Sequence, residues 1–261
     1  MQYQGGKSRI ARDIADIISI RGGDVGLRYQ GGKSRIAKDV ASRITPGGSD
    51  TFVSLFCGSC AVESKVKGFP RMILNDLHPY LIAMLKGVQR GYTLPDSISE
   101  DEYRFLRENP DLDPVLTGFV GFGCSFGGKW FGGYARNKGG TNYAAQSKKS
   151  LLKDMTGLQT AEFTCSDYRT VPIPAGATIY ADPPYQGTTG YRMGRFDSGE
   201  FWNYMRLIAQ TGHPLYISEL TAPDDFECIW EKPFTRTLDR NKENQFKSTE
   251  KLFIYKGGTV G

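Results

Sequence analysis

The segment Asp182-Pro183-Pro184-Tyr185 has residue types and spacing that could carry out chemistry on a planar amine. The Asp182 carboxylate and the Pro183 carbonyl are adjacent acceptors, and the prolines stiffen the turn without adding a backbone N–H. This fork can accept both hydrogens of an exocyclic amine while the ring of Tyr185 stacks on a planar ring. The alternative is a strand that ends in a proline-stiffened turn and leaves Asp182 in solvent.

A glycine turn at Gly58-Ser59 is a second feature that could take part in binding a ligand. Such a turn lets the backbone approach a ligand, and the first N–H groups of a following helix attract an anionic group. A plain tight turn fits the same residues. Cys57 and Cys60 have the C-x-x-C spacing of redox and zinc sites, but no second pair exists and neither histidine has ligand spacing. We therefore expect no metal.

Three charged residues have two open interpretations each. Asp76 ends a strand-like run and could bind ribose hydroxyls or cap the helix expected after it. Asp167, beside Tyr168, could contact a ligand or simply stabilise a turn. Lys33 follows two glycines and could pair with a carboxylate or point into solvent.

Alternating strand and helix patterns must position these residues. Strands are expected at 51–57, 71–76, 162–165, 177–182 and 214–218, helices at 34–44, 61–67, 79–89 and 199–210, and an antiparallel hairpin at 234–238 and 251–256. This alternation predicts a parallel sheet with right-handed crossovers. Open α/β sheets carry their chemistry at the carboxyl ends of strands, and Asp182 stands at one of them.

The middle of the chain breaks this alternation. Helices are expected at 99–109 and 147–157, and the segment between them, 115–134, is dense in glycine and aromatic residues. We therefore divide the chain into one catalytic α/β domain, residues 1–89 with 160–261, and an insertion at 90–159.

A repeat occurs near the beginning of the chain, where YQGGKSRIA stands at both 3–11 and 29–37. Two copies are too few for a solenoid, so we interpret the repeat as a local duplication with one redundant copy. The second copy is the shorter connection to the strand at 51–57, and short connections dominate in compact domains. We expect the second copy to form the functional site. The alternative is that the first copy occupies it and residues 22–28 loop out, because long loops cost little extra closure entropy.

From Tyr29 onward the chain resembles the Dam-like (D12 class) N6-adenine-specific DNA methyltransferases, which carry D-P-P-Y and use S-adenosylmethionine. YQGGK at 29–33 is similar to the family's aromatic-x-Gly-Gly-Lys segment, and FCGSCAVES at 56–64 resembles its Phe-x-Gly-x-Gly loop. Ser166-Asp167-Tyr168 resembles the acid–aromatic pair before the catalytic strand, and EKLFIY at 250–255 resembles the last strand. Cys60 departs from the family, which usually has glycine there, and a side chain makes positive φ costly.

The resemblance implies a Rossmann-like S-adenosylmethionine-dependent methyltransferase sheet with a small helical and loop insertion for DNA target recognition. The implied catalytic residues are Asp182, Pro183, Pro184 and Tyr185. The implied cofactor-binding residues are Tyr29, Lys33, Phe56, Gly58, Ser59, Cys60, Asp76, Asp167, Tyr168 and Asp182.

DNA recognition is expected from the insertion, because basic side chains contact phosphates and aromatic ones stack or wedge between bases. A flexible glycine loop is the alternative for this segment, and a solvated hairpin is the alternative for the polar loop near 241–247. The expected DNA-binding residues are Lys129, Trp130, Tyr134, Arg136, Lys138, Lys148, Asn241 and Lys242.

Composition limits the remaining function classes. The 261 residues are 39% hydrophobic and 23% charged with a net charge of +5, which indicates a globular protein and permits a nucleic-acid partner. No apolar run reaches the roughly 18 residues of a membrane span, no secretory signal is evident, and five cysteines favour reduced thiols. We expect a cytoplasmic monomer without metal.

The sequence thus predicts a site-specific enzyme that methylates adenine N6 in double-stranded DNA after flipping the base out of the duplex, as in restriction–modification or phage DNA modification. Two alternatives stay open. One is an exocyclic-amine methyltransferase for another base or for RNA. The other is a catalytically weak protein that binds DNA and the cofactor.

Overall fold

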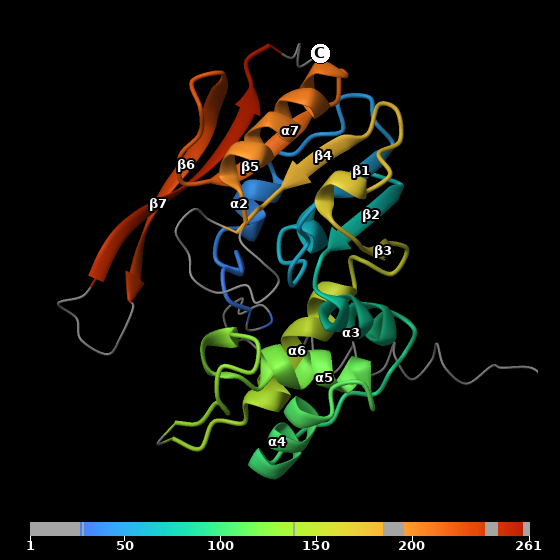
Figure 1. Ribbon diagram of the computed structural model, residues 1–261, viewed down its shortest axis with the longest axis vertical. Coiled ribbons are helices and arrows are strands. Elements are labelled where there is room, and N and C mark those ends of the chain that lie inside the picture. Colours follow the sequence, from blue (N-terminus) through green and yellow to red (C-terminus); the bar gives the residue numbers. More distant parts are fainter. Residues whose placement is uncertain (1–26, 28, 138, 185–195, 238–244, 258–261) are drawn as a thin grey trace, which may run out of the picture. The chain divides into compact units, whose positions relative to one another are not determined.

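Figure 1 shows the computed structural model of the chain, which describes residues 27, 29–137, 139–184, 196–237 and 245–257. The chain divides into two compact units. The sheet unit consists of 44–57, 67–77 and 166–261, and the helical unit of 1–43, 58–66 and 78–165. The division of function between 1–89 with 160–261 and 90–159 stays a prediction.

The described elements are the following. The helices are α2 (Ala37–Ala41), α3 (Pro79–Gln89), α4 (Glu100–Glu108), α5 (Pro114–Gly123), α6 (Tyr143–Met155) and α7 (Ser198–Gln210), and the 3-10 helices are η1 (Glu63–Lys65), η2 (Phe126–Gly128) and η3 (Tyr168–Thr170). The strands are β1 (Thr51–Ser54), β2 (Arg71–Asp76), β3 (Glu162–Cys165), β4 (Thr178–Ala181), β5 (Leu215–Glu219), β6 (Phe226–Thr237) and β7 (Gln245–Tyr255).

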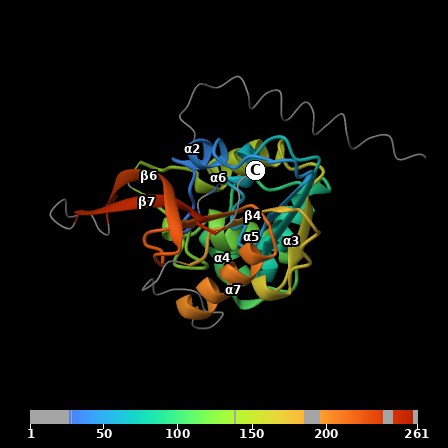
Figure 2. The same cartoon turned by 90° about the horizontal axis from the view of Figure 1, so that it is seen from above.

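The sheet is mixed and has the strand order β3-β2-β1-β4-β5-β7-β6. β1 pairs in parallel with β2 and β4, and β4 pairs in parallel with β5. β7 runs antiparallel to β5 and to β6, and Figure 2 shows β6 and β7 side by side. All residues of β1 and of β4 are buried, as expected for central parallel strands. The predicted Rossmann-like α/β fold is confirmed.

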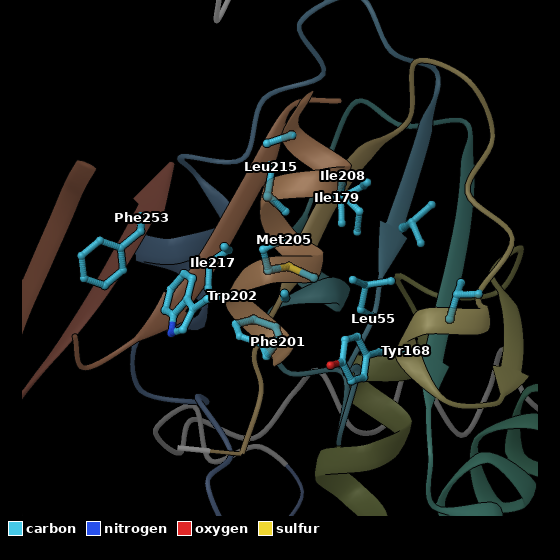
Figure 3. Packing of buried hydrophobic residues seen from close by; sticks show 14 of the residues in the cluster. Leu55, Tyr168, Ile179, Phe201, Trp202, Met205, Ile208, Leu215, Ile217 and Phe253 are labelled. Carbon is cyan, nitrogen blue, oxygen red and sulfur yellow. The ribbon is translucent and has the colours of Figure 1, made fainter. Parts of the chain in front are cut away.

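One hydrophobic core holds the sheet unit together between α7 and the strands (Figure 3). Helix α7 contributes Phe201, Trp202, Met205 and Ile208, which recur at helical spacing and therefore share one face. Opposite them lie side chains of the strands, among them Ile179, Leu215, Ile217 and Phe253. Asp197 caps the helix by accepting from the Glu200 N–H at 3.0 Å. This packing fixes the strands whose ends carry the candidate site.

The helical unit packs α3 against α5 through glycines of α5. A Cβ on Gly118 would lie 2.1 Å from the Tyr80 carbonyl oxygen, and one on Gly121 would lie 2.3 Å from the Trp130 ring. The glycine-rich segment is therefore partly a helix, because only glycine permits this close approach. Asp113 caps α5 by accepting from the Leu116 N–H at 2.9 Å.

Most predicted elements are confirmed, and β2, α3 and β3 have the predicted bounds. The helix expected at 61–67 is wrong: only η1 forms there, and Val66 is already extended, because two β-branched valines flank it and Gly68 follows. The helix expected at 34–44 is shortened to α2 by turns on both sides. The C-terminal hairpin is longer than predicted.

Candidate functional site

The candidate site lies where β1, β2 and β4 end in the sheet unit. These strands are parallel neighbours, so their carboxyl ends reach the same edge of the sheet. The loop after β1 is tied to both neighbours: the Leu55 N–H donates to the Tyr180 carbonyl at 3.0 Å, and the Cys57 N–H donates to the Asn75 carbonyl at 2.7 Å. Phe56, Asp76 and Asp182 therefore leave the sheet at one edge.

The segment predicted to be catalytic follows directly on β4. Asp182 is half-buried, Pro183 is buried and Pro184 is half-buried, so the carboxylate keeps access to a partner while the first proline is packed. The preceding strand is rigid, since Tyr180 is buried and its hydroxyl shares a hydrogen bond of 2.9 Å with Ser218. Tyr185 lies outside the described residues.

Asn75 is a site residue that the sequence analysis missed. Its side-chain amide donates to the Leu55 carbonyl at 3.1 Å and to the Ser166 carbonyl at 2.9 Å. Its side-chain oxygen accepts from the Ser166 N–H at 3.1 Å and from the Ser166 hydroxyl at 3.0 Å. Asn75 is 1% exposed; its bond to Leu55 is buried and its bonds to Ser166 are partly buried. Its position next to Asp76 at a strand end was the available signal.

Asp76 itself is a carboxylate with 6% exposure at the last position of β2. Burial of a carboxylate is costly unless it is hydrogen-bonded or paired. The helix α3 that follows is capped by another residue, since the His78 ring nitrogen Nδ1 accepts from the Leu81 N–H at 3.3 Å. This observation weakens the alternative that Asp76 is only a helix cap.

Aromatic rings gather at the same edge. The Phe56 ring lies 5.0 Å from the Tyr168 ring and tilted by 34°, and both lie about 6 Å from the ring of Phe201. Phe196 completes the group at 6.1 Å from Phe56. Burial raises the pKa of Tyr168 to about 12, so its hydroxyl stays neutral at physiological pH. This aromatic group can contact a planar ring.

Asp167 is held beside this group by Arg169. The guanidinium donates to both carboxylate oxygens of Asp167 at 2.8 Å, and it also pairs with Glu200. These bonds lower the pKa of Asp167, which therefore stays ionised and can still accept a hydrogen bond. Asp167 also accepts from the Arg169 N–H at 2.9 Å, so the turn interpretation holds as well.

In the helical unit, the YQGGK segment packs on the glycine turn. Gly58 has φ of +48°, and a Cβ there would lie 3.1 Å from the Tyr29 ring. The positive φ and the close contact both favour glycine at this position. On its other side the Tyr29 ring lies 5.0 Å from the ring of Phe122. Gly32 lies near Ser59, with 3.7 Å between its Cβ position and the hydroxyl.

Three further predicted cofactor residues are buried in this unit. Ser59 is 4% exposed, Cys60 0% and Lys33 5%. Lys33 is therefore not a solvated lysine. Cys60 has φ of +59°, so it adopts the left-handed conformation that glycine takes easily and cysteine only at a cost.

The residues predicted to bind DNA have different surroundings. Lys129 is exposed, Arg136 pairs with Glu100 at 3.0 Å, and Lys148 pairs with Asp96 at 2.8 Å. Such exposed pairs contribute little to stability and can open for a phosphate. Lys138, Asn241 and Lys242 lie outside the described residues.

The predicted aromatic contacts have structural roles. Trp130 is half-buried, with its ring 4.3 Å from His78 and 5.4 Å from Tyr80. The Tyr134 hydroxyl donates to the Ile98 carbonyl at 2.6 Å. The Phe126 N–H donates to the Gly133 carbonyl at 2.7 Å and closes the loop between them.

Within the described part of the chain, no group of three or more His, Cys, Asp or Glu side chains could hold a metal ion. The helices described there are also too short or too polar to cross a membrane.

Part of the chain matches a known protein family. Residues 29–111 match the family of D12 class N6 adenine-specific DNA methyltransferases. The matched range contains the YQGGK segment, the glycine turn and Asp76, so the resemblance is confirmed over this part of the chain. The sequence has no significant match among curated proteins.

Several solved structures are similar in fold. They include the rRNA methyltransferase aviRa from Streptomyces viridochromogenes (TM-score 0.37, 13% identity, 98% of this chain and 97% of that one). A candidate RNA methyltransferase from Pyrococcus horikoshii has a TM-score of 0.41 and 8% identity over 95% of this chain and 98% of that one. A candidate methyltransferase from Escherichia coli has a TM-score of 0.39 and 12% identity over 90% and 96%. Such low scores say nothing about the substrate of this chain.

Proposed function

We propose that the chain is an S-adenosylmethionine-dependent enzyme that methylates adenine N6 in double-stranded DNA. The observation that carries this proposal is the Asp182-Pro183 fork at the end of β4, beside the ends of β1 and β2. The family match at 29–111 supports it independently, because that range does not contain the fork.

The residues of the sheet unit fit the proposed cofactor. Asp76 offers a buried carboxylate for ribose hydroxyls, Phe56 and Tyr168 offer rings for the adenine, and the ionised Asp167 can accept from its amine. When bound, S-adenosylmethionine supplies a methyl group on a sulfonium sulfur. The roles of Tyr29, Lys33, Gly58, Ser59 and Cys60 toward the same ligand remain predictions from the resemblance.

In this proposal the adenine is flipped out of the duplex so that its N6 reaches the fork. Asp182 and the Pro183 carbonyl accept the two N6 hydrogens, which makes the nitrogen lone pair more available. The fork would thus present N6 to the methyl group that S-adenosylmethionine supplies, and the proton that N6 loses would pass to solvent or to Asp182. Catalysis then rests on positioning and electrostatics.

Two alternatives are separated from this proposal by product analysis. An enzyme for cytosine N4 or for RNA would use the same fork, and a catalytically weak protein would bind DNA and cofactor without turnover. Incubation with labelled S-adenosylmethionine and duplex DNA, single-stranded DNA or RNA, followed by mass spectrometry of the nucleosides, identifies the methylated atom. N6-methyladenine from duplex DNA supports the proposal, and any other main product overturns it.

The role of Asp182 is tested by Asp182→Ala. We expect turnover to fall more than tenfold, equivalent to ~1.4 kcal/mol of barrier, while cofactor binding stays within a few-fold. Asp224→Ala is the matched control, because this carboxylate is exposed in the same unit. If Asp182→Ala keeps more than about a tenth of wild-type turnover, the fork does not hold the amine.

A further inference from the structure

The second copy of the YQGGKSRIA repeat is packed into the helical unit from its first residues onward. Leu27, just before the copy, lies 3.6 Å from the Cβ position of Gly123. The Tyr29 ring packs on Phe122, and the Gln30 N–H donates to the Gly128 carbonyl at 3.0 Å. The surface that receives this copy, which we call the docking place, is formed by Gly58, Phe122, Gly123 and Gly128.

The first copy carries the side chains that the second copy buries. Beyond its aromatic residue, the second copy, helix α2 and the turn after it have six buried side chains, of which the last belongs to the sheet unit: Lys33, Ile36, Ala37, Val40, Ala41 and Ile44. At an offset of 26 residues, the first copy places Lys7, Ile10, Ala11, Ile14, Ala15 and Ile18 at these positions. Only Ile14 differs from its counterpart, by one methylene, and Met1 stands in register with Leu27.

The remaining differences between 3–18 and 29–44 avoid the buried positions. Arg12, Asp16 and Ile17 stand in register with Lys38, Ser42 and Arg43. Lys38 and Ser42 are exposed and Arg43 is half-buried. The similarity therefore follows burial: it persists beyond the nine identical residues wherever the docked copy touches the interior.

We propose that residues 3–18 are a second occupant of the docking place and exchange with residues 29–44 within one chain. The basis is that Tyr29 and Gln30, which contact the docking place, recur as Tyr3 and Gln4, and that five of the six buried positions after them are identical in the two segments. This inference concerns the fold and does not depend on the enzymatic activity proposed above.

Chain connectivity sets the balance between the two occupants. From Ile44 to the first residue of β1, Thr51, the chain advances seven residues, but from Ile18 it advances 33. Because closure of a loop becomes less favourable with the 3/2 power of its length, the second copy is favoured roughly tenfold. The structure accordingly has the second copy docked, and the first is expected to take over when docking of the second is weakened by more than that factor.

Limited trypsin digestion of the full chain under native conditions tests this exchange, with cleavage after Lys7 and after Lys33 followed by mass spectrometry. In the wild type we expect Lys33 to be cleaved about tenfold more slowly than Lys7, because the second copy is docked. Tyr29→Ala removes the ring that packs on Phe122. In this variant we expect Lys33 to become the faster site and Lys7 to become protected at least threefold.

Tyr3→Ala/Tyr29→Ala is the matched control, in which neither copy has the ring and protection of Lys7 is lost again. The exchange is disproved if Lys7 is cleaved equally fast in the single and double variants. If circular dichroism shows that Tyr29→Ala unfolds the protein, Tyr29→Leu takes its place in the single variant and in the double variant. The same comparison of Lys7 cleavage then applies. Digestion at two protein concentrations completes the test, since protection of Lys7 that increases with concentration means exchange between chains and overturns the proposal.

Discussion

At the scale of single residues, the candidate site depends on Asn75 as much as on the carboxylates beside it. One buried amide holds the loop after β1 and the segment that carries Asp167 and Tyr168. Without the Asn75 amide, the Leu55 carbonyl and the backbone of Ser166 would lose these partners, and a buried polar group without a partner is costly. Asn75 is thus a positioning residue for the proposed cofactor contacts.

Asn75→Ala should destabilise the protein by about 2–4 kcal/mol, because it leaves the Leu55 carbonyl and the backbone of Ser166 without these partners. Urea unfolding measures the change. Asn203→Ala, which removes an exposed amide on α7, should change stability by less than ~0.5 kcal/mol. Equal effects of the two substitutions would contradict the role assigned to Asn75.

Cys60 gives a second prediction at this scale, because its positive φ is strained for any residue with a side chain and most strained for a β-branched one. Cys60→Val should cost on the order of 2 kcal/mol or more, and Cys60→Gly should cost clearly less, since relief of strain offsets the lost packing. Thermal unfolding compares the two. A valine variant more stable than the glycine variant would mean that the backbone at Cys60 is not strained.

At the scale of elements, α3 begins on a histidine that must stay neutral. His78 accepts from the Leu81 N–H and is 6% exposed, with its ring 4.9 Å from Phe122 and 4.3 Å from Trp130. Burial lowers the pKa of His78 from 6.5 to about 4. A protonated ring could not accept this bond and would be a buried charge among aromatic rings.

The start of α3 should therefore make the protein sensitive to acid. Since the folded-state pKa of His78 is below its unfolded value, its contribution to stability is complete above about pH 6.5 and is lost as the pH falls toward 4. The lost contribution to the free energy of unfolding is on the order of 3 kcal/mol. His78→Asn keeps a capping residue that does not titrate, so urea unfolding from pH 7 to 4 should show a flatter profile. If His78→Asn has the same dependence of stability on pH as the wild type, His78 is not the cause of the acid sensitivity.

For the molecule as a whole, the distribution of charge determines how strongly the proposed DNA substrate is attracted. The net charge of +5 is modest, so binding must depend on local groups rather than on the overall field. Lys129 is exposed, and Arg136 has only an exposed ion pair with Glu100. Both can exchange water or a surface partner for a phosphate at small cost.

Lys129→Ala/Arg136→Ala should weaken DNA binding and reduce the slope of log affinity against log salt by up to roughly 1.8, since each phosphate contact releases about 0.9 counterions. Cofactor affinity should not change. Lys67→Ala/Arg90→Ala removes the same charge from exposed positions elsewhere and serves as the control. If both double variants have the same salt slope, Lys129 and Arg136 are not part of the DNA interface.

Elements with local causes could be predicted from the sequence. The bounds of β2 and α3 follow from an apolar run, a capping residue and a proline at the first helical turn, all within a few positions of one another. The place of Asp182 at a strand end follows in the same way. In segment 61–67 the local signals were weak, and the prediction of a helix there was wrong.

Contacts between residues far apart in the sequence could not be predicted from local patterns, because they depend on how the elements pack. Asn75 bonds to Ser166, 91 positions away, and the Tyr29 ring requires a glycine at 58. The Trp130 ring, predicted to contact DNA, also packs on His78, and Gly121 of α5 leaves room for it. The two YQGGKSRIA copies are identical in sequence, and the structure shows the second one packed on Phe122 and Gly128.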